Sequence, residues 1–161
     1  MFSLAVFVIA ADQFSKMWID RVKPFIEVIP GFFNITYVRN PGAAFGILQG
    51  RQYLLAIISS IAGLVLIAML LREDEKKKVL LLSLSLVLGG TIGNLIDRLR
   101  FGYVIDFLDV YVSFGREHHW PSFNIADSAI SCGVVLLICA MLVDECACSK
   151  QKVSPSDQNT P

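Results

Sequence analysis

The sequence predicts an all-α integral membrane protein, with four transmembrane helices and a small β-like cradle in the first outer loop. Two observations lead to this fold class. Of the 161 residues, 55% are hydrophobic and only 17% are charged, and the mean hydropathy is +0.61, far from an average soluble domain. The charged residues also cluster outside long apolar runs, so they cannot form the even polar shell that a soluble protein needs.

Composition excludes two further classes of protein. The high apolar content excludes a disordered chain. Fourteen basic and fourteen acidic residues give a net charge of zero, which provides no overall electrostatic attraction for nucleic acid. We therefore expect membrane lipid, and no nucleic acid, among the partners.

The first expected helix covers about residues 1–19. Its apolar run ends at Ala11, and Asp12 and Lys16 follow four residues apart on one helical face, where they can pair and let the helix continue. The alternative is a cleaved signal peptide, because the apolar run has a suitable length and ends in two alanines. We favour a retained helix, since no basic segment precedes the run.

Three further apolar runs are long enough to cross a membrane, which takes about 20 residues. We expect these helices at about 52–71, 79–97 and 123–143, the last interrupted only by Asp127. Residues 1–148 then form a single membrane-embedded domain. The polar, proline-containing segment 149–161 is expected to be a disordered cytoplasmic tail.

The distribution of Lys and Arg predicts the orientation in the membrane. Four of the seven residues 72–78 are basic, whereas the loop 20–51 spreads four basic residues over its whole length. Because short cytoplasmic loops carry an excess of Lys and Arg, both chain ends are expected in the cytoplasm. The loops 20–51 and 98–121 then lie together on the outer face.

The outer loops contain short segments with strand composition. Residues 25–38 are rich in Ile, Val, Phe, Tyr and Thr and are flanked by Pro and Gly, a pattern typical of short strands and turns. Residues 103–112 have a similar composition. The first segment is the basis for the expected cradle.

Polar residues inside apolar spans are costly and therefore mark possible sites. Asn94, Asp97 and Arg98 fall at positions i, i+3 and i+4, on one helical face. Three of the five residues before them are glycine, which lets a neighbouring helix approach closely. The plainer alternative is a packing asparagine followed by an acid and a base solvated at the helix end.

A second polar group lies around the start of the last helix. Asn124 and Asp127 are three residues apart, and Asp127 alone could simply complement the helix dipole. Asp106 and Asp109 lie among apolar residues of the second outer loop. Their odd spacing places them on opposite faces of a strand, so at most one of them should face the membrane site.

Asp106 and Asp127 both belong to the outer interface in this topology. Two carboxylates that meet cannot both ionise easily, so they share one proton. One can then activate water against an amide carbonyl while the other protonates the leaving nitrogen, with neither metal nor cofactor. Whether the two side chains meet depends on how the loop folds.

Other chemistries find little support in the chain. His118 and His119 are adjacent, but no G-x-S-x-G context accompanies them. No phosphate-binding glycine motif occurs. Four cysteines lie within the last 30 residues, without a disulfide framework or further ligands at metal spacing, and we expect reduced thiols: Cys132, Cys139, Cys146 and Cys148.

Five motifs, in order along the chain, resemble lipoprotein signal peptidase, the bacterial type II signal peptidase. They are DQFSK at 12–16, NPGAAFG at 40–46, GNLIDR at 93–98, GYVIDF at 102–107 and FNIAD at 123–127. The resemblance implies a four-helix aspartyl endopeptidase of the bacterial inner membrane. Such an enzyme removes the signal peptide of a prolipoprotein on the amino side of a diacylglyceryl-modified cysteine.

The resemblance also implies residue roles. The catalytic pair falls on Asp106 and Asp127, while Asp12 and Lys16 match a first-helix motif with a structural or site-supporting role. The substrate-binding positions of the family fall on Asn40, Asn94, Asp97, Arg98 and Asn124. The implied partners are diacylglyceryl-modified prolipoproteins, membrane lipid and a globomycin-type inhibitor, and no metal or cofactor is implied.

Two other function classes remain as alternatives. The first is a small ion or proton carrier, in which the ionisable residues of the spans form a relay: Asp12, Lys16, Asp97, Arg98 and Asp127. All five lie near the outer ends of their helices and the second helix has none, which favours a surface site over a relay. The second alternative is a noncatalytic membrane scaffold, which would tolerate conservative changes at the aspartates.

Overall fold

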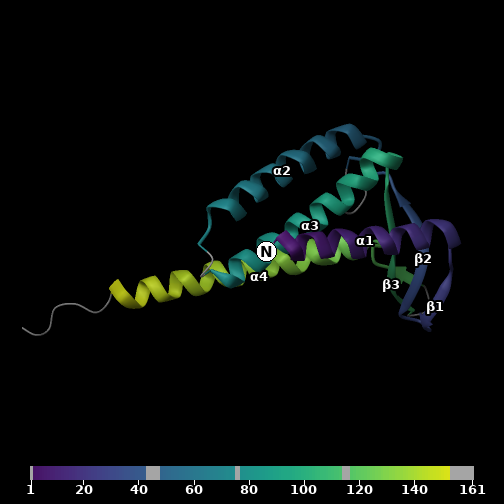
Figure 1. Cartoon of the computed structure of the whole chain (residues 1–161). Helices are drawn as coiled ribbons and strands as arrows, with labels where there is room; N and C mark the ends of the chain where they lie inside the picture. The colour runs from purple at the N-terminus through teal and green to yellow at the C-terminus, as the bar shows by residue number, and fades with distance from the viewer. Residues whose placement is uncertain (1, 43–47, 75–76, 114–116, 153–161) are drawn as a thin grey trace, which may run out of the picture.

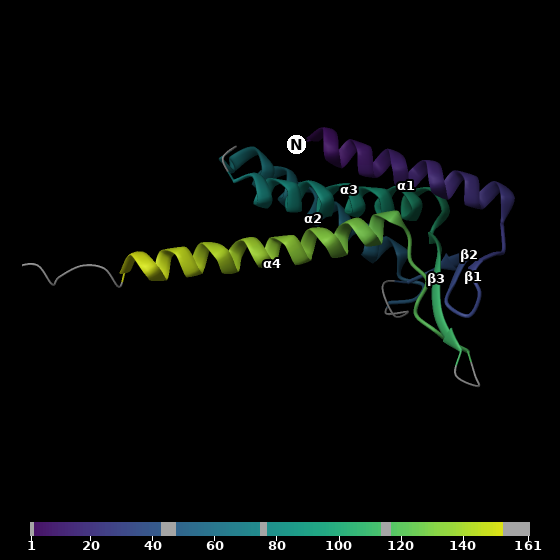
Figure 2. The ribbon, with the colours of Figure 1, turned by 90° about the horizontal axis from the view of Figure 1, so that it is seen from below.

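In the computed structural model, a bundle of long helices carries a small sheet at one end (Figures 1 and 2). The structure describes residues 2–42, 48–74, 77–113 and 117–152, without the side chains of 113 and 143–152. The elements follow in the order α1 (Phe2–Val22), β1 (Ile26–Ile29), β2 (Phe33–Asn40), α2 (Gln52–Arg72), α3 (Lys78–Phe101), β3 (Val104–Ser113), β4 (Glu117–His119) and α4 (Ile125–Lys152).

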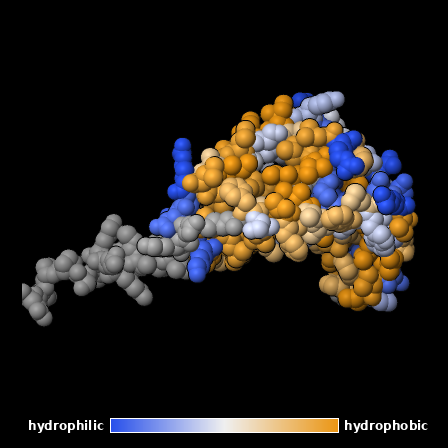
Figure 3. All heavy atoms as spheres, in the orientation of Figure 1, coloured by the Kyte–Doolittle hydropathy of each residue, from blue (hydrophilic) through white to orange (hydrophobic). Residues whose placement is uncertain are grey.

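Within the described part of the chain, four helices are long and apolar enough to cross a membrane, as expected. Helix α3 is the central one: half of its most apolar window is buried, against 17–28% for the other three, and it packs against α1, α2 and α4. Many apolar side chains of the bundle point outward, among them Phe7 and Leu64, each 68% exposed. Figure 3 shows this apolar surface over the bundle, with hydrophilic residues gathered toward its ends. Such a surface fits lipid as the surrounding solvent.

Glycines on α3 allow the close helix contacts that the sequence predicts. A Cβ atom on Gly89 would lie 2.7 Å from Cβ of Val8 in α1, and one on Gly90 would lie 2.3 Å from the carbonyl oxygen of Ala126 in α4. Any larger residue at these positions would force the neighbouring helix away. The two glycines therefore fix where α1 and α4 lie against α3.

The expected class, all-α with a cradle in the first outer loop, holds for the four helices but understates the β structure: the described residues form an antiparallel sheet in the order β1-β2-β3-β4. The second outer loop supplies β3 and β4. Strand β3 pairs with β2 from Phe33↔Val110 to Asn40↔Val104, because both segments carry the β-branched and aromatic residues that favour strands. The sheet is anchored to the bundle through Ile19, Ile105 and Phe107, which form a buried cluster.

Helix α2 ends within one residue of its expected end, and the other three extend further than expected. Helix α1 continues to Val22, before Pro24, and α3 continues to Phe101, where Gly102 adopts φ +74° and donates its N–H to the Arg98 carbonyl. Helix α4 continues to Lys152, so residues 149–152 of the expected tail are helical. Their sequence, Ser-Lys-Gln-Lys, contains no helix-breaking Gly or Pro. The rest of the expected tail lies outside the described residues.

Candidate active site

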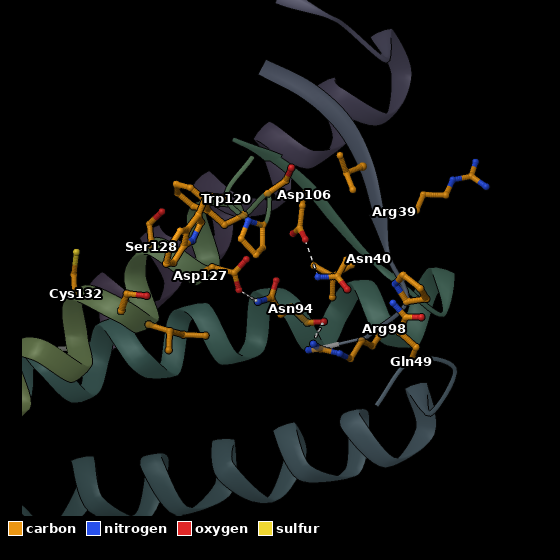
Figure 4. Close-up of a pocket in the computed structure, with 18 residues that line it drawn as sticks. Arg39, Asn40, Gln49, Asn94, Arg98, Asp106, Trp120, Asp127, Ser128 and Cys132 are labelled. Atoms are coloured by element: carbon orange, nitrogen blue, oxygen red, sulfur yellow. Dashed lines mark hydrogen bonds between the residues drawn. The ribbon is translucent and has the colours of Figure 1, made fainter. Parts of the chain in front are cut away.

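A cavity of about 970 Å³ opens where the sheet meets the ends of α3 and α4. Five polar residues of its wall are among the sequence-predicted site residues: Asn40, Asn94, Arg98, Asp106 and Asp127. Figure 4 shows Asp106 and Asp127 on this wall, from β3 and α4 respectively. The rest of the wall includes apolar side chains such as Trp120, Phe123 and Ile130. The fold therefore brings together the two carboxylates that the sequence places 21 positions apart.

Strand β3 is tied to the segment that leads into α4. The backbone N–H groups of Phe107 and Leu108 both donate to the Phe123 carbonyl, at 3.0 and 2.8 Å, and Phe123 donates back to Leu108. This bridge sets the strand that carries Asp106 against the start of the helix that carries Asp127. Backbone hydrogen bonds thus hold together the two segments that carry these carboxylates.

Asn124 links the two carboxylates directly. Its side-chain Nδ2 donates to Asp106 Oδ1 at 2.7 Å, and its backbone N–H donates to Asp127 Oδ2 at 3.2 Å. Its own Oδ1 accepts from the backbone N–H of Asp127 at 2.9 Å, which caps the first turn of α4. Asn124 is fully buried, so it holds the pair from behind the cavity wall.

Each carboxylate also accepts a hydrogen bond from the side-chain amide of one further residue. Asn40 Nδ2 donates to Asp106 Oδ2 at 2.9 Å, and Asn94 Nδ2 donates to Asp127 Oδ1 at 2.7 Å. The orientation of Asn40 is set by the backbone N–H of Gly42, which donates to its Oδ1. Both aspartates are therefore held in defined rotamers by two donors each.

Burial changes the acidity of Asp106. The carboxyl is 1% exposed, and this desolvation, with a smaller contribution from the negative charge of Asp127, raises the pKa of Asp106 to about 7. A carboxyl with such a pKa can hold a proton at neutral pH and release it. That property is required of a general acid working beside an ionised partner.

Arg98 supplies positive charge at the edge of the cavity. Its Nη1 reaches the Asn94 carbonyl at 3.5 Å (Figure 4). Its Nε is buried and has no hydrogen-bond partner among the described residues.

Asp97 and Asn124, both expected at the substrate, lie behind the cavity wall. Asp97 is 1% exposed, and its Oδ2 accepts from the backbone N–H of Ile105 at 3.1 Å. The expected pair of Asp12 and Lys16 forms, with 2.9 Å between Oδ2 and Nζ. These side chains are buried and already bond to other protein groups, which favours a supporting role over a contact with substrate.

Gln13 is a site residue that the sequence reasoning missed. Its Nε2 donates to Asp97 Oδ1 at 3.0 Å, to the Gly93 carbonyl at 3.1 Å and to Asp12 Oδ2 at 3.2 Å. It joins α1 to α3 near the end of the bundle that carries the sheet. Its position inside the DQFSK motif, as a polar residue in an apolar span, was the available signal.

Asp109 faces a different environment from Asp106, as the odd spacing predicts. Its Oδ2 accepts from Asn34 Nδ2 at 3.3 Å, and its Oδ1 lies 2.9 Å from His119 Nδ1. His119 belongs to β4, an element the sequence did not predict. His118 follows Glu117 in the same short, exposed strand.

Cys132 and Cys139 are free and exposed, and the side chains of Cys146 and Cys148 lie outside the described residues. Among the residues that the structure describes, no three His, Cys, Asp or Glu side chains are grouped so that they could hold a metal ion.

Comparisons with known proteins agree on one family. The family model described as signal peptidase (SPase) II matches residues 4–143. The lipoprotein signal peptidase of Syntrophus aciditrophicus (strain SB) is 46% identical over 143 residues, which cover 84% of this chain and 87% of that protein. That of Syntrophotalea carbinolica is 47% identical over 147 residues, which cover 88% and 89%. A solved bacterial membrane enzyme is 35% identical, with a TM-score of 0.79 over 98% of this chain and 92% of that one.

Proposed function

The chain belongs to the signal peptidase II family, and on this premise we propose that it is an aspartic-type endopeptidase that cleaves prolipoproteins. Its substrates are diacylglyceryl-modified precursors, cut on the amino side of the lipidated cysteine. The observation that carries the proposal is the pair Asp106 and Asp127 on the wall of one cavity, joined through Asn124. The apolar bundle supports a multi-pass location in the bacterial inner membrane.

The two aspartates act as general base and general acid. In our assignment Asp127, ionised, removes a proton from a water molecule whose oxygen attacks the scissile carbonyl carbon. Asp106, protonated, gives its proton to the nitrogen that leaves. The water is thereby divided between the new carboxyl group and the new amine, and the single proton of the pair ends on Asp127. A pKa of about 7 at Asp106 supports its role as the acid.

The polar groups around the pair have the geometry to hold a peptide. Asn40 and Asn94 orient the carboxylates, and Arg98 places a positive charge on the cavity wall, where it attracts a substrate carbonyl. The apolar part of the cavity wall, which includes Phe123 and Ile130, provides surface for the lipidated segment. The acyl chains can then stay in hydrocarbon while the peptide bond lies among polar groups.

Orientation follows from the position of the basic residues. The sheet lies at one end of the bundle, while the C-terminal end of α2 and the N-terminal end of α3, next to the basic segment 72–78, lie at the other (Figure 2). The cavity is at the sheet end, because residues of β2, β3 and the adjacent ends of α3 and α4 line it. The excess of basic residues at cytoplasmic ends supports cytoplasmic termini and an active site near the outer face. We further propose that a globomycin-type cyclic peptide inhibits the enzyme by occupying the cavity.

The experiment that tests the proposal uses purified protein and a diacylglyceryl-modified prolipoprotein, with and without globomycin, and detects cleavage as a gel shift. We expect cleavage that globomycin blocks. Asp106→Asn and Asp127→Asn should each abolish it while the protein stays inserted and folded. Cleavage retained by either variant would refute the two-aspartate mechanism, and no cleavage by the parent protein would refute the assignment of substrate.

The carrier alternative is less well supported by the geometry. A relay needs ionisable groups at several depths of the membrane, whereas Asp12, Lys16 and Asp97 form one buried cluster beside the sheet. Their hydrogen bonds are directed at the backbone next to Asp106 and Asp127. This arrangement fits a supported catalytic site.

A further inference from the structure

Lys16 is a buried cation whose donors are all used. Its side chain is 2% exposed, and Nζ lies 2.9 Å from Asp12 Oδ2, 3.0 Å from Asp97 Oδ2 and 2.9 Å from Asn94 Oδ1. An ammonium group has three N–H donors, and here each has one acceptor. Burying a charge is costly unless it is paired and hydrogen-bonded. A buried lysine whose three donors all have acceptors therefore indicates a specific role.

Each of its three acceptors leads to a catalytic aspartate. Asp97 Oδ2 also accepts the backbone N–H of Ile105, the residue before Asp106, at 3.1 Å. Asp12 Oδ1 accepts the backbone N–H of Ala126, the residue before Asp127, at 3.0 Å. The third acceptor, Asn94, donates directly to Asp127 Oδ1 at 2.7 Å. The acceptors of one ammonium group thus bond either to a catalytic aspartate itself or to the backbone of the residue before it.

The charge on Lys16 also determines which way the Asn94 amide points. An ammonium group can only donate, so Asn94 must turn its Oδ1 toward Lys16 and its NH₂ toward Asp127. Asn124 Nδ2 donates to the same Oδ1 at 3.2 Å, which favours the same orientation. If the lysine were replaced by a side chain without this charge, the main constraint on the amide would be lost.

From these contacts we infer that Lys16 is a positioning residue for the cleavage reaction: it sets the separation of Asp106 and Asp127 and keeps Asn94 as a donor to Asp127. The inference rests on the proposed function, which assigns those two aspartates as catalytic. It deepens that function, because Lys16 lies outside the cavity wall and acts through its acceptors. Substrate binding should therefore be unaffected by its loss, while the chemical step should be slowed.

The test uses two variants of the full-length membrane protein. Lys16→Met alone would leave Asp12 and Asp97 as two buried charges without a cation, so Asp97→Asn is combined with it to keep the net charge of the cluster unchanged. The second variant, Lys16→Arg, retains the buried charge and therefore the fold, but it carries its donors on a longer planar group. Thermal unfolding in detergent confirms that each variant is folded.

The expected result is a separation of kcat from KM. Because misplacement of a catalytic group by about 1 Å costs roughly 100-fold, we expect kcat for a lipidated precursor to fall about 100-fold in the double variant and about 10-fold in Lys16→Arg. KM should stay within about twofold of the parent, since no substrate contact is removed. Lys77→Met is the matched control, because it removes an exposed ammonium that is also paired with a carboxylate four residues away, Glu73 at 2.9 Å.

The possible outcomes separate this inference from the proposed function. A folded variant of either kind with the kcat of the parent overturns the positioning role, even if the parent cleaves its substrate. A rise in KM with unchanged kcat also overturns it, because that result would indicate a substrate contact. A parent protein that does not cleave at all refutes the proposed function itself.

Discussion

Replacing Gly90 with alanine tests how the contact between α3 and α4 positions Asp106 and Asp127, the proposed catalytic pair. Gly90 lies at a close contact between these helices: a Cβ atom there would lie 2.3 Å from the Ala126 carbonyl oxygen and 2.7 Å from Cγ1 of Ile130. The Ile130 side chain can rotate away. The Ala126 carbonyl is backbone and can retreat only with its helix.

The size of the displacement follows from the contact distance. A carbon and a carbonyl oxygen come no closer than about 3.3 Å in ordinary contacts, so Gly90→Ala requires the start of α4 to move by about 1 Å. Asp127 is the next residue after Ala126 and moves with it, while Asp106 stays on the sheet. Because a misplacement of about 1 Å costs roughly 100-fold, we expect kcat/KM for a lipidated precursor to fall about 100-fold.

The assay compares Gly90→Ala with Gly63→Ala, by gel-shift kinetics on a lipidated precursor and by thermal unfolding. Gly63 is also a helical glycine, in α2, but a Cβ atom there would meet nothing within 4 Å. Gly63→Ala should therefore keep the kcat/KM of the parent. A folded Gly90→Ala protein with parental kcat/KM would refute the view that this contact determines the distance between the aspartates.

Three further predictions concern Asp106, Asp109 and His119, which all lie on the sheet. Since burial raises the pKa of Asp106 to about 7 and the protonated form is the acid, kcat/KM should fall about tenfold per pH unit above that pKa; a flat profile from pH 7 to 9 would contradict this assignment. Asp109→Asn should leave cleavage nearly unchanged, because Asp109 contacts Asn34 and His119 rather than the cavity; a loss as complete as in Asp106→Asn would mean that the wrong carboxylate was chosen. The hydrogen bond to Asp109 raises the pKa of His119 above 6.5 in the folded protein, so this bond stabilises the fold below pH 6.5 and the benefit is lost as pH rises through the folded pKa. The Tm of His119→Gln should therefore lie below that of the parent at pH 6 and converge with it at alkaline pH.

The sequence predicted the arrangement at the polar end of α3 only in part. Asn94, Asp97 and Arg98 share one helical face by spacing, yet the structure directs them to different neighbours. On a helix with 3.6 residues per turn, positions i+3 and i+4 lie about 100° apart around the axis. Arg98 therefore reaches the cavity, while Asp97 faces α1 and binds Lys16. Which neighbour lies on which side depends on the packing of the bundle, which the spacing does not contain.

For the outer loops, the sequence predicted the strands but not how they pair. Composition alone indicated strands in both outer loops, and the alternation of a strand correctly separated Asp106 from Asp109. The pairing of β2 with β3 joins residues about 70 positions apart, such as Val38 and Asp106, and no local pattern predicts it. This pairing, with the irregular register between Ile35 and Val38, places Asn40 beside Asp106. The family resemblance indicated that Asn40 belongs to the site, whereas spacing along the chain gives no sign of its contact with Asp106.

The two aspartates of the site are held by different kinds of element. This difference explains why so many buried polar groups surround the site. Asp106 is carried by a strand, whose position depends on its ladder to β2, whereas Asp127 is carried by a helix, whose position depends on packing against Gly90. Two such elements would vary independently if only apolar contacts joined them, because hydrophobic packing is not directional. Asn124, together with Asp12 and Asp97 of the buried Lys16 cluster, supplies directional hydrogen bonds to both the strand and the helix. These bonds hold the two carboxylates at a constant distance, which the proposed mechanism requires because the pair has to share one proton.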